Sequence, residues 1–325
     1  MLKKLQFLLV VLAAAGCVTK PAAVDAPLSV VGRPDVMEVG PVLHAVNELG
    51  QTASFRSGGI DNLFKDAGSP AGSAGAFDHA AGRADVAAQA ETQALRASVD
   101  HPNLRIILTV TEGLYRVVAR RSAGITGMSD LRGKRIGVFE GTSAAYFLHC
   151  MLAGAGLSEE DVVLVPLRPR EMEPAIAARQ VDAVVIWEPE SERSLATLGA
   201  DAIAFSDPLQ YRELYNLNTT AEALADPSRR GKIVALVRAV LASGKVAQDR
   251  PQEIWPLVSA SSGYDLRLVA RSWPHHSFPG DLPADVVDVL YAEEQWLAQE
   301  HDRRPRSREI IASMIDRSVL EEARR

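Results

Sequence analysis

Short apolar runs alternate with amphipathic segments in the middle of the chain, between residues 131 and 189. Each run has the length and the branched side chains of a buried strand. After the first run, Phe147 and Met151 fall at helical spacing, so one face of that segment packs inward. Strands that alternate with helices predict parallel strands joined by crossover helices. We predict strands at residues 136–139, 162–165 and 181–186, and a helix at residues 171–179.

Similar patterns continue on both sides of this stretch. Further strands are predicted at residues 28–31, 84–88, 106–110 and 202–205, with crossings between domains at residues 114–119 and 214–220. Asp226 and Pro227 signal the start of a helix, because a capping side chain precedes a proline at the first helical position. Later helices are predicted at residues 251–259, 266–272, 283–299 and 307–318.

Polar residues follow several of the predicted strands. The carboxyl ends of parallel strands are where open α/β sheets collect the groups that bind ligands. Residues in these positions are therefore candidates for a ligand site. They are Asp35, Glu91, Thr92, Glu112, Gly141, Thr142, Ser143, Trp187 and Glu188.

The loop of Gly141, Thr142 and Ser143 could hold an anion or a carbonyl group. Gly141 permits a sharp turn, and Thr142 or Ser143 can cap the helix that follows. Free amides at a helix N-terminus and two hydroxyls suit such a ligand. A capped helix without a ligand is the alternative. A serine hydrolase is disfavoured, because the second glycine of the G-x-S-x-G motif is missing.

Trp187 and Glu188 could supply a stacking face and a hydrogen-bond acceptor, although Trp187 could equally belong to the core. With Glu91 and Glu112, Glu188 would make the cleft acidic, unless each carboxylate is simply solvated at the surface. An acidic cleft favours a neutral or cationic nitrogen heterocycle over nitrate or a sulfonate. The preference would reverse if the Gly141 loop and a cation such as Arg33 outweighed the carboxylates.

The N-terminus has the pattern of a secretory signal. Lys3 and Lys4 precede an apolar run at residues 5–15 that is too short for an ordinary membrane span. The ending L-A-A-A-G-C at residues 12–17 resembles a bacterial lipobox, in which Cys17 would be lipidated. An ordinary cleaved signal with a chance cysteine is the alternative. We predict a lipoprotein signal peptide at residues 1–17 and a tether at residues 18–27.

Composition narrows the function. The chain has 325 residues, enough for two domains, and its net charge of -6 argues against a nucleic-acid partner. With only Cys17 and Cys150 a disulfide framework is excluded, and Cys150 fits a small core residue. The His275 and His276 pair lacks a metal-site spacing, and the glycines match no phosphate or dinucleotide motif. We therefore expect no metal and no cofactor.

Four segments in order carry a family resemblance: L-R-G-K-R-I-G-V at residues 131–138, G-T-S at 141–143, G-L-S-E-E-D-V at 156–162 and Q-V-D-A-V-V-I-W-E-P at 180–189. The series resembles the periplasmic substrate-binding proteins of ABC importers, specifically the nitrate/sulfonate/taurine and thiamine-pyrimidine group. The resemblance extends from about residue 28 to the C-terminus.

The resemblance implies an α/β fold of the type II periplasmic-binding-protein class, with two domains, a hinge and a central ligand cleft. Domain 1 would be discontinuous, at residues 28–115 and 208–325, and domain 2 would occupy residues 116–207. The C-terminal helices would pack on domain 1. Residues 67–81, which are rich in Gly, Ala and Ser, could be a flexible linker, whereas the resemblance suggests a small-residue helix.

These patterns lead to a functional hypothesis. The chain is interpreted as a periplasmic, lipid-anchored solute-binding protein, not an enzyme, that delivers a small organic ligand to an ABC permease. One alternative is an enzyme on the same fold that acts on a pyrimidine-like molecule. The pyrimidine-forming relative in thiamine synthesis uses a cysteine-rich motif, which two cysteines cannot form. A tethered ligand sensor without a permease is a third possibility.

Overall fold

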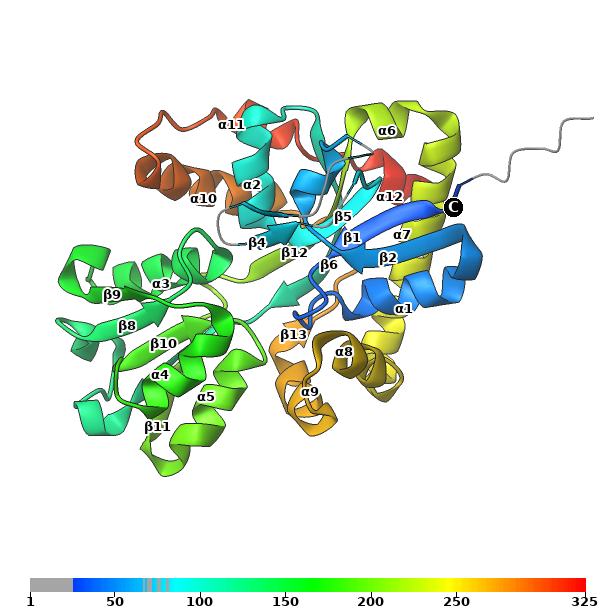
Figure 1. Cartoon of the computed structure of the whole chain (residues 1–325). Helices are drawn as coiled ribbons and strands as arrows, with labels where there is room; N and C mark the ends of the chain where they lie inside the picture. The colour runs from blue at the N-terminus through cyan, green and yellow to red at the C-terminus, as the bar shows by residue number, and fades with distance from the viewer. Residues whose placement is uncertain (1–25, 67, 69–71, 75–76, 80–81) are drawn as a thin grey trace, which may run out of the picture.

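The computed structural model describes residues 26–325 except 67, 69–71, 75–76 and 80–81. Two β-sheets, each covered by helices, form two lobes (Figure 1). This is the predicted α/β fold. The predicted signal peptide, Cys17 and most of the tether lie outside the described residues. No helix in the described part of the chain is long and apolar enough to cross a membrane.

The sheet of the first lobe has the strand order β13-β6-β12-β5-β1-β2. Strands β1, β2 and β5 are parallel, whereas β12 runs antiparallel between β5 and β6. All residues of β5 and β12 are buried, as expected for central strands covered on both faces. The strands are β1 (Leu28–Gly32), β2 (Ala53–Ser57), β5 (Val86–Ala90), β6 (Leu104–Gly113), β12 (Glu213–Thr220) and β13 (His276–Ser277).

The sheet of the second lobe has the order β11-β7-β10-β8-β9, with β8, β9 and β10 parallel. Strand β7 pairs antiparallel with both β10 and β11. This confirms the alternation of strands and helices predicted for residues 131–189. The strands are β7 (Arg116–Arg120), β8 (Arg135–Val138), β9 (Val163–Pro166), β10 (Ala183–Ile186) and β11 (Ala202–Phe205). The helices are α3 (Ser143–Gly154), α4 (Met172–Ala177) and α5 (Glu190–Leu198).

The chain crosses between the lobes twice. Strand β6 of the first sheet ends at Gly113 and β7 of the second begins at Arg116; β11 ends at Phe205 and β12 begins at Glu213. The return crossing predicted at residues 214–220 is wrong, because those residues form β12 of the first sheet and the chain has already crossed before Glu213. The division into domains at residues 115/116 and 207/208 stays a prediction. We propose that the connections act as the hinge, since a few residues between rigid elements can absorb a change in backbone angles.

Helices cover the sheet of the first lobe. The long helix α7 begins as predicted: Pro227 is its first residue, and the Asp226 side chain accepts hydrogen bonds from the amides of Ser228 and Arg229. Helices α8 and α9 lie below this sheet, and α9 packs beside α5 of the second lobe (Figure 1). The helices are α1 (Gly40–Leu49), α2 (Glu91–Asp100), α6 (Ala221–Ala225), α7 (Pro227–Asp249), α8 (Trp255–Ser262), α9 (Leu266–Ser272), α10 (Val286–Glu300), α11 (Arg308–Ala312) and α12 (Ser318–Ala323).

Two segments differ from the predictions. The helix predicted at residues 307–318 is the shorter α11, because the next residues pair with β6: the amide of Ile106 donates to the carbonyl of Met314 at 2.7 Å. In the small-residue stretch, the short strands β3 (Gly72–Ala74) and β4 (Phe77–His79) pair antiparallel, so the suggested helix is wrong there. Glycine weakens a helix, which fits this outcome. The other residues of that stretch lie mostly outside the described part.

Candidate ligand-binding site

A small central pocket lies between the two lobes, where the carboxyl ends of the parallel strands of both sheets meet. Its volume is about 30 Å³, which is room for about two water molecules. The first lobe contributes the loop after β1, the end of β5 and the start of β12. The second lobe contributes the start of α3 and the residue after β10. The pocket is lined by Arg33, Val36, Glu38, Gln89, Ala90, Gln93, Thr142, Ser143, Trp187, Glu213 and Tyr215.

Thr142 and Ser143 line the pocket where the sequence placed them, at the start of α3. Their hydroxyls do not cap the helix, in contrast to the prediction. Thr142 occupies the N-cap position, yet its hydroxyl donates backward to the carbonyl of Phe139 at 2.6 Å. The Ser143 hydroxyl shares a hydrogen bond of 2.9 Å with that of Tyr115. The tight turn before the helix therefore holds both side chains at the pocket wall.

Trp187 forms an aromatic wall of the pocket and belongs to the core as well. Its side chain follows β10 directly and is 7% exposed. The Trp187 ring lies 6.0 Å from the ring of Phe139 and 6.5 Å from that of Tyr115. The two interpretations offered by the sequence, pocket contact and core packing, thus describe the same side chain. An apolar face held in this way suits the flat body of a small organic ligand.

Three of the predicted acidic residues do not line the central pocket, because arginines hold them elsewhere. Glu188 is buried, and its carboxylate lies 2.5 Å from the guanidinium of Arg116. Glu112 accepts hydrogen bonds from Arg212 at 2.7 Å and from Ser277 at 2.8 Å. Asp35 pairs with Arg33 at 2.6 Å. Arg33 does line the pocket, so the cation that could have favoured an anionic ligand has its charge balanced by Asp35.

Glu91 and Thr92 lie behind the central pocket, in the first turn of α2. The Glu91 carboxylate accepts hydrogen bonds from the hydroxyl of Tyr211 and from the amide of Leu214 at 2.9 Å. Burial raises the pKa of Glu91 to about 7, although these hydrogen bonds oppose the shift. Thr92 donates to Glu293 at 2.5 Å. Both residues tie α2 to its neighbours and do not line the pocket.

Two other carboxyl groups line the pocket, and the sequence reasoning missed both. Glu38 lies in the loop between β1 and α1, and Glu213 is the first residue of β12; they are 1% and 4% exposed. The sequence did contain a signal for Glu213, namely its position at the start of a strand. An antiparallel strand begins at the edge where its parallel neighbours end, so its first residue reaches the same edge. Glu38 shares the loop of Asp35, but only the folded loop shows which of the two faces inward.

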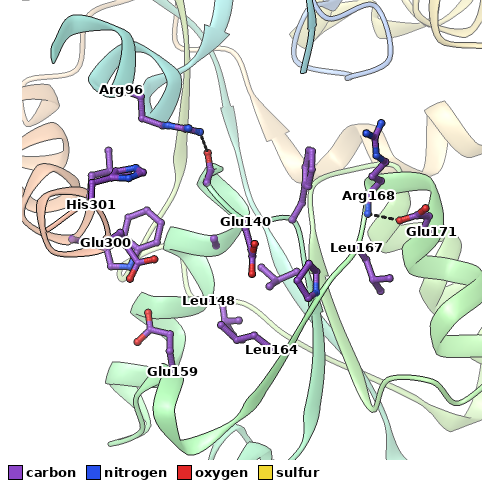
Figure 2. Close-up of a pocket in the computed structure, with 17 residues that line it drawn as sticks. Arg96, Glu140, Leu148, Glu159, Leu164, Leu167, Arg168, Glu171, Glu300 and His301 are labelled. Carbon is purple, nitrogen blue, oxygen red and sulfur yellow. Dashed lines mark hydrogen bonds between the residues drawn. The ribbon is translucent and has the colours of Figure 1, made fainter. Parts of the chain in front are cut away.

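A much wider side groove opens next to the central pocket, with a volume of about 740 Å³. Figure 2 shows Arg96 above it, Glu300 and His301 on one side, Arg168 and Glu171 on the other, and Leu148 and Leu164 below. We define the side groove by its lining residues. These are Arg96, Val138, Phe139, Glu140, Gly141, Ala145, Leu148, Glu159, Leu164, Pro166, Leu167, Arg168, Glu171, Trp296, Leu297, Glu300 and His301.

Gly141 lines the side groove and joins the two lobes. Its φ of 67° lies in the left-handed region that favours glycine. Its carbonyl accepts a hydrogen bond from Arg96 at 2.8 Å (Figure 2). It accepts another from Gln93 at 3.0 Å, and both donors lie on α2 of the first lobe. The predicted loop of residues 141–143 therefore separates the two cavities, with Gly141 on one side and the hydroxyls of Thr142 and Ser143 on the other.

Comparison with known sequences identifies one matching family and a partial relative. Residues 57–254 match the family model described as NMT1/THI5 like. A stretch of 74 residues is 42% identical to a protein of Brucella abortus (strain 2308) whose name describes it as a binding protein. That match covers 23% of this chain and 23% of the relative, so it spans under a quarter of the relative's length.

Solved structures with low sequence identity share the fold. The alkanesulfonate-binding protein SsuA from Xanthomonas axonopodis pv. citri, bound to MOPS, is 19% identical with a TM-score of 0.65, covering 91% of this chain and 100% of that one. The nitrate-binding protein NrtA from Synechocystis PCC 6803 is 11% identical with a TM-score of 0.70, covering 92% and 88%. The desulfurization enzyme DSZB, as a mutant with biphenyl-2-sulfinic acid, is 17% identical with a TM-score of 0.61, covering 91% and 98%.

The fold is therefore that of the periplasmic binding proteins, as the sequence resemblance implied. The family match extends from the last residue of β2 to just beyond α7, so it covers the whole second lobe and part of the first. The chain belongs to the NMT1/THI5-like family of proteins.

Proposed function

We propose that this protein is a lipid-anchored periplasmic solute-binding protein that delivers a small organic ligand to the permease of an ABC importer. The observation that carries the proposal is the central pocket, because residues from both lobes line it. A ligand that contacts both lobes only when they are together stabilises the closed form. The family and the fold of the transport proteins described above support the same function.

The proposed mechanism is closure around the ligand. A cavity of about 30 Å³ does not admit an organic molecule from outside, so the lobes must part for the ligand to enter. Several contacts hold them together. Among them, Gly141 accepts from Arg96, Tyr264 donates to Glu190 at 2.6 Å, and Arg170 donates to the carbonyl of Ser262 at 2.8 Å. Together they would give the permease a closed form to recognise.

The alternative function is an enzyme on the same fold, which the likeness to a desulfurization enzyme keeps open. The one cysteine in the described part of the chain does not favour it. Cys150 is partly buried in α3, and burial raises the pKa of its thiol to about 11. Few thiolates are present at neutral pH when a thiol has such a pKa, so Cys150 is a poor nucleophile.

The test is native mass spectrometry of the mature domain, followed by thermal shifts with pyrimidines, aromatic acids, amines and sulfonates. We expect a saturable rise in melting temperature with one class, since a ligand stabilises the state that binds it, and we expect that ligand to be recovered unchanged. Chemical turnover of any compound would favour the enzyme instead. Mass spectrometry of the N-terminal peptide from native membranes tests lipidation of Cys17.

A double variant, Thr142→Ala with Ser143→Ala, tests the loop. It removes two hydroxyls from the pocket wall, so the affinity for the ligand identified in this way is expected to fall about tenfold, the effect of losing one or two hydrogen bonds. Ser313→Ala, on the surface after α11, is the matched control and should bind normally. Unchanged affinity in the folded double variant would remove this loop from the site.

A further inference from the structure

The carboxyl groups of Glu38 and Glu213 line the central pocket, and three of their four oxygens have no hydrogen-bond partner among the described residues. Both side chains are almost completely buried, at 1% and 4% exposure. Neither oxygen of Glu38 makes a hydrogen bond, and Oε2 of Glu213 makes none. Buried polar atoms are nearly always paired, because desolvation without a compensating bond costs free energy. Unpaired acceptors at a pocket wall therefore indicate a ligand that donates to them.

A histidine compensates at most one of these two charges. Nε2 of His276 lies 3.4 Å from Oε1 of Glu38. Burial alone would lower the pKa of His276, but the Glu38 carboxyl outweighs it, so the pKa is raised. The pair of Glu38 and His276 can thus be neutral overall.

Glu213 lies among other acids. Burial raises the pKa of Glu213 well above the usual value, and the charges of Glu38 and Glu91 raise it further, as does the direct contact with the Glu38 carboxyl group. A hydrogen bond from Tyr115 opposes the shift. Two like charges close together in a dry site are costly. A cation or a strong N–H donor in the pocket would remove that cost, whereas an anion would increase it. Arg33, at the pocket wall, has its charge balanced by Asp35.

Resting on the proposed function, we propose that the ligand presents a cationic or N–H-rich nitrogen group, such as an amidine, a protonated amine or an aminoheterocycle, to Glu38 and Glu213. Its N–H groups donate to the free carboxyl oxygens, and its apolar body lies against Trp187. Sulfonates and nitrate, which the structural neighbours bind by name, are excluded as ligands of this chain. The fold is shared, but the charge in the pocket differs from what an anion needs.

The experiment compares cations and anions of similar shape on the purified mature protein. Calorimetry measures the dissociation constants of benzamidine, 4-aminopyrimidine, benzoate and 1-propanesulfonate for the natural chain, Glu213→Gln, Glu38→Gln and the control Glu48→Gln. Glu48 is an exposed residue of α1 away from the pocket. We expect benzamidine or 4-aminopyrimidine to bind, and either pocket variant to bind it at least about tenfold more weakly. Glu48→Gln should change nothing.

The selectivity ratio separates a binding role from a structural one. In Glu213→Gln the preference for benzamidine over benzoate should fall, which a general loss of packing would not cause. The variant should melt no lower than the natural chain without probe, because glutamine lacks the charge that opposes Glu38; if it fails to fold, Glu38→Gln carries the test. Binding of the anions only would overturn this inference and leave solute capture intact. Binding of none of the probes, with no ligand recovered by native mass spectrometry, would overturn both.

Discussion

The central pocket and the side groove share one loop, residues 141–143, but their charged side chains differ in exposure and in pairing. The side groove is large and open, and its acids and bases are mixed at the surface. The central pocket is small, and its two carboxyl groups are buried with unpaired oxygens. We therefore assign the proposed ligand to the smaller cavity. Unpaired buried atoms mark the site better than volume does.

Two adjacent residues of α10 repeat this contrast. Burial would raise the pKa of Glu294, but hydrogen bonds from Arg303 and Arg306 lower it to about 2. Burial raises the pKa of its neighbour Glu293 well above the usual value, and the charge of Glu91 adds to the shift. Consecutive residues of a helix point in different directions, so one faces the C-terminal arginines and the other faces the acids behind the pocket. Position in space, not in sequence, decides their charge.

The largest expected effect comes from a matched pair of tryptophans. Trp187 lines the central pocket and Trp296 lines the side groove, and both are 7% exposed. Trp187→Ala and Trp296→Ala should each lower the unfolding free energy by about 3–5 kcal/mol, the usual cost of removing a large core side chain. Only Trp187→Ala should also abolish the thermal shift given by the best ligand of the panel. Loss of that shift in Trp296→Ala would assign the ligand to the groove, and the milder changes to Phe serve if the Ala variants do not fold.

A smaller effect, on the order of 2–3 kcal/mol in each case, is expected in the dependence of stability on pH. The pKa of Glu91 in the folded protein, about 7, lies above its usual 4.5. Its contribution to the unfolding free energy is therefore fully present below pH 4.5 and is lost as the pH rises through 7. The folded pKa of Glu294, about 2, lies below its usual 4.5, so its contribution is present above pH 4.5 and is lost toward pH 2.

Urea unfolding at a series of pH values measures both windows. Glu91→Gln should reduce the decrease in unfolding free energy between pH 4.5 and 7 and leave the decrease below pH 4.5 unchanged. Glu294→Gln should flatten only the fall below pH 4.5. If both variants changed the unfolding free energy in the same pH range, the proposed difference between Glu91, behind the pocket, and Glu294, beside the arginines, would be wrong.

The smallest effect concerns closure. Tyr264→Phe removes the hydroxyl that donates to Glu190 across the lobes, while the ring stays beneath the guanidinium of Arg170 at 4.8 Å. We expect the closed form to lose about 1 kcal/mol, seen as a larger radius of gyration by small-angle X-ray scattering. Tyr291→Phe, within the first lobe, is the control. A radius unchanged in Tyr264→Phe would show that this contact does not hold the lobes together.

Much of the architecture could be predicted from the sequence because local patterns encode it. The strands of the second lobe are short apolar runs, and α7 begins at a capping aspartate followed by proline. The segment after α11 could not be predicted in this way, since its pairing with β6 joins residues far apart in the chain. Thr142, Ser143 and Trp187 were found because strand ends and turns are also local features. Their ligand contacts remain predictions.

By itself the sequence determined the alternation of strands and helices, the order of the family segments and the positions of the loops that follow the parallel strands. Only the tertiary structure decided which carboxyl groups face the central pocket. Hydrogen bonds and arginines hold Glu91, Glu112 and Glu188 away from the pocket. Glu38, before α1, and Glu213, at the start of β12, both line it, although they are far apart in the sequence. The physical reason is that the charge state of an acid depends on its burial and its neighbours, and distant parts of the chain supply both.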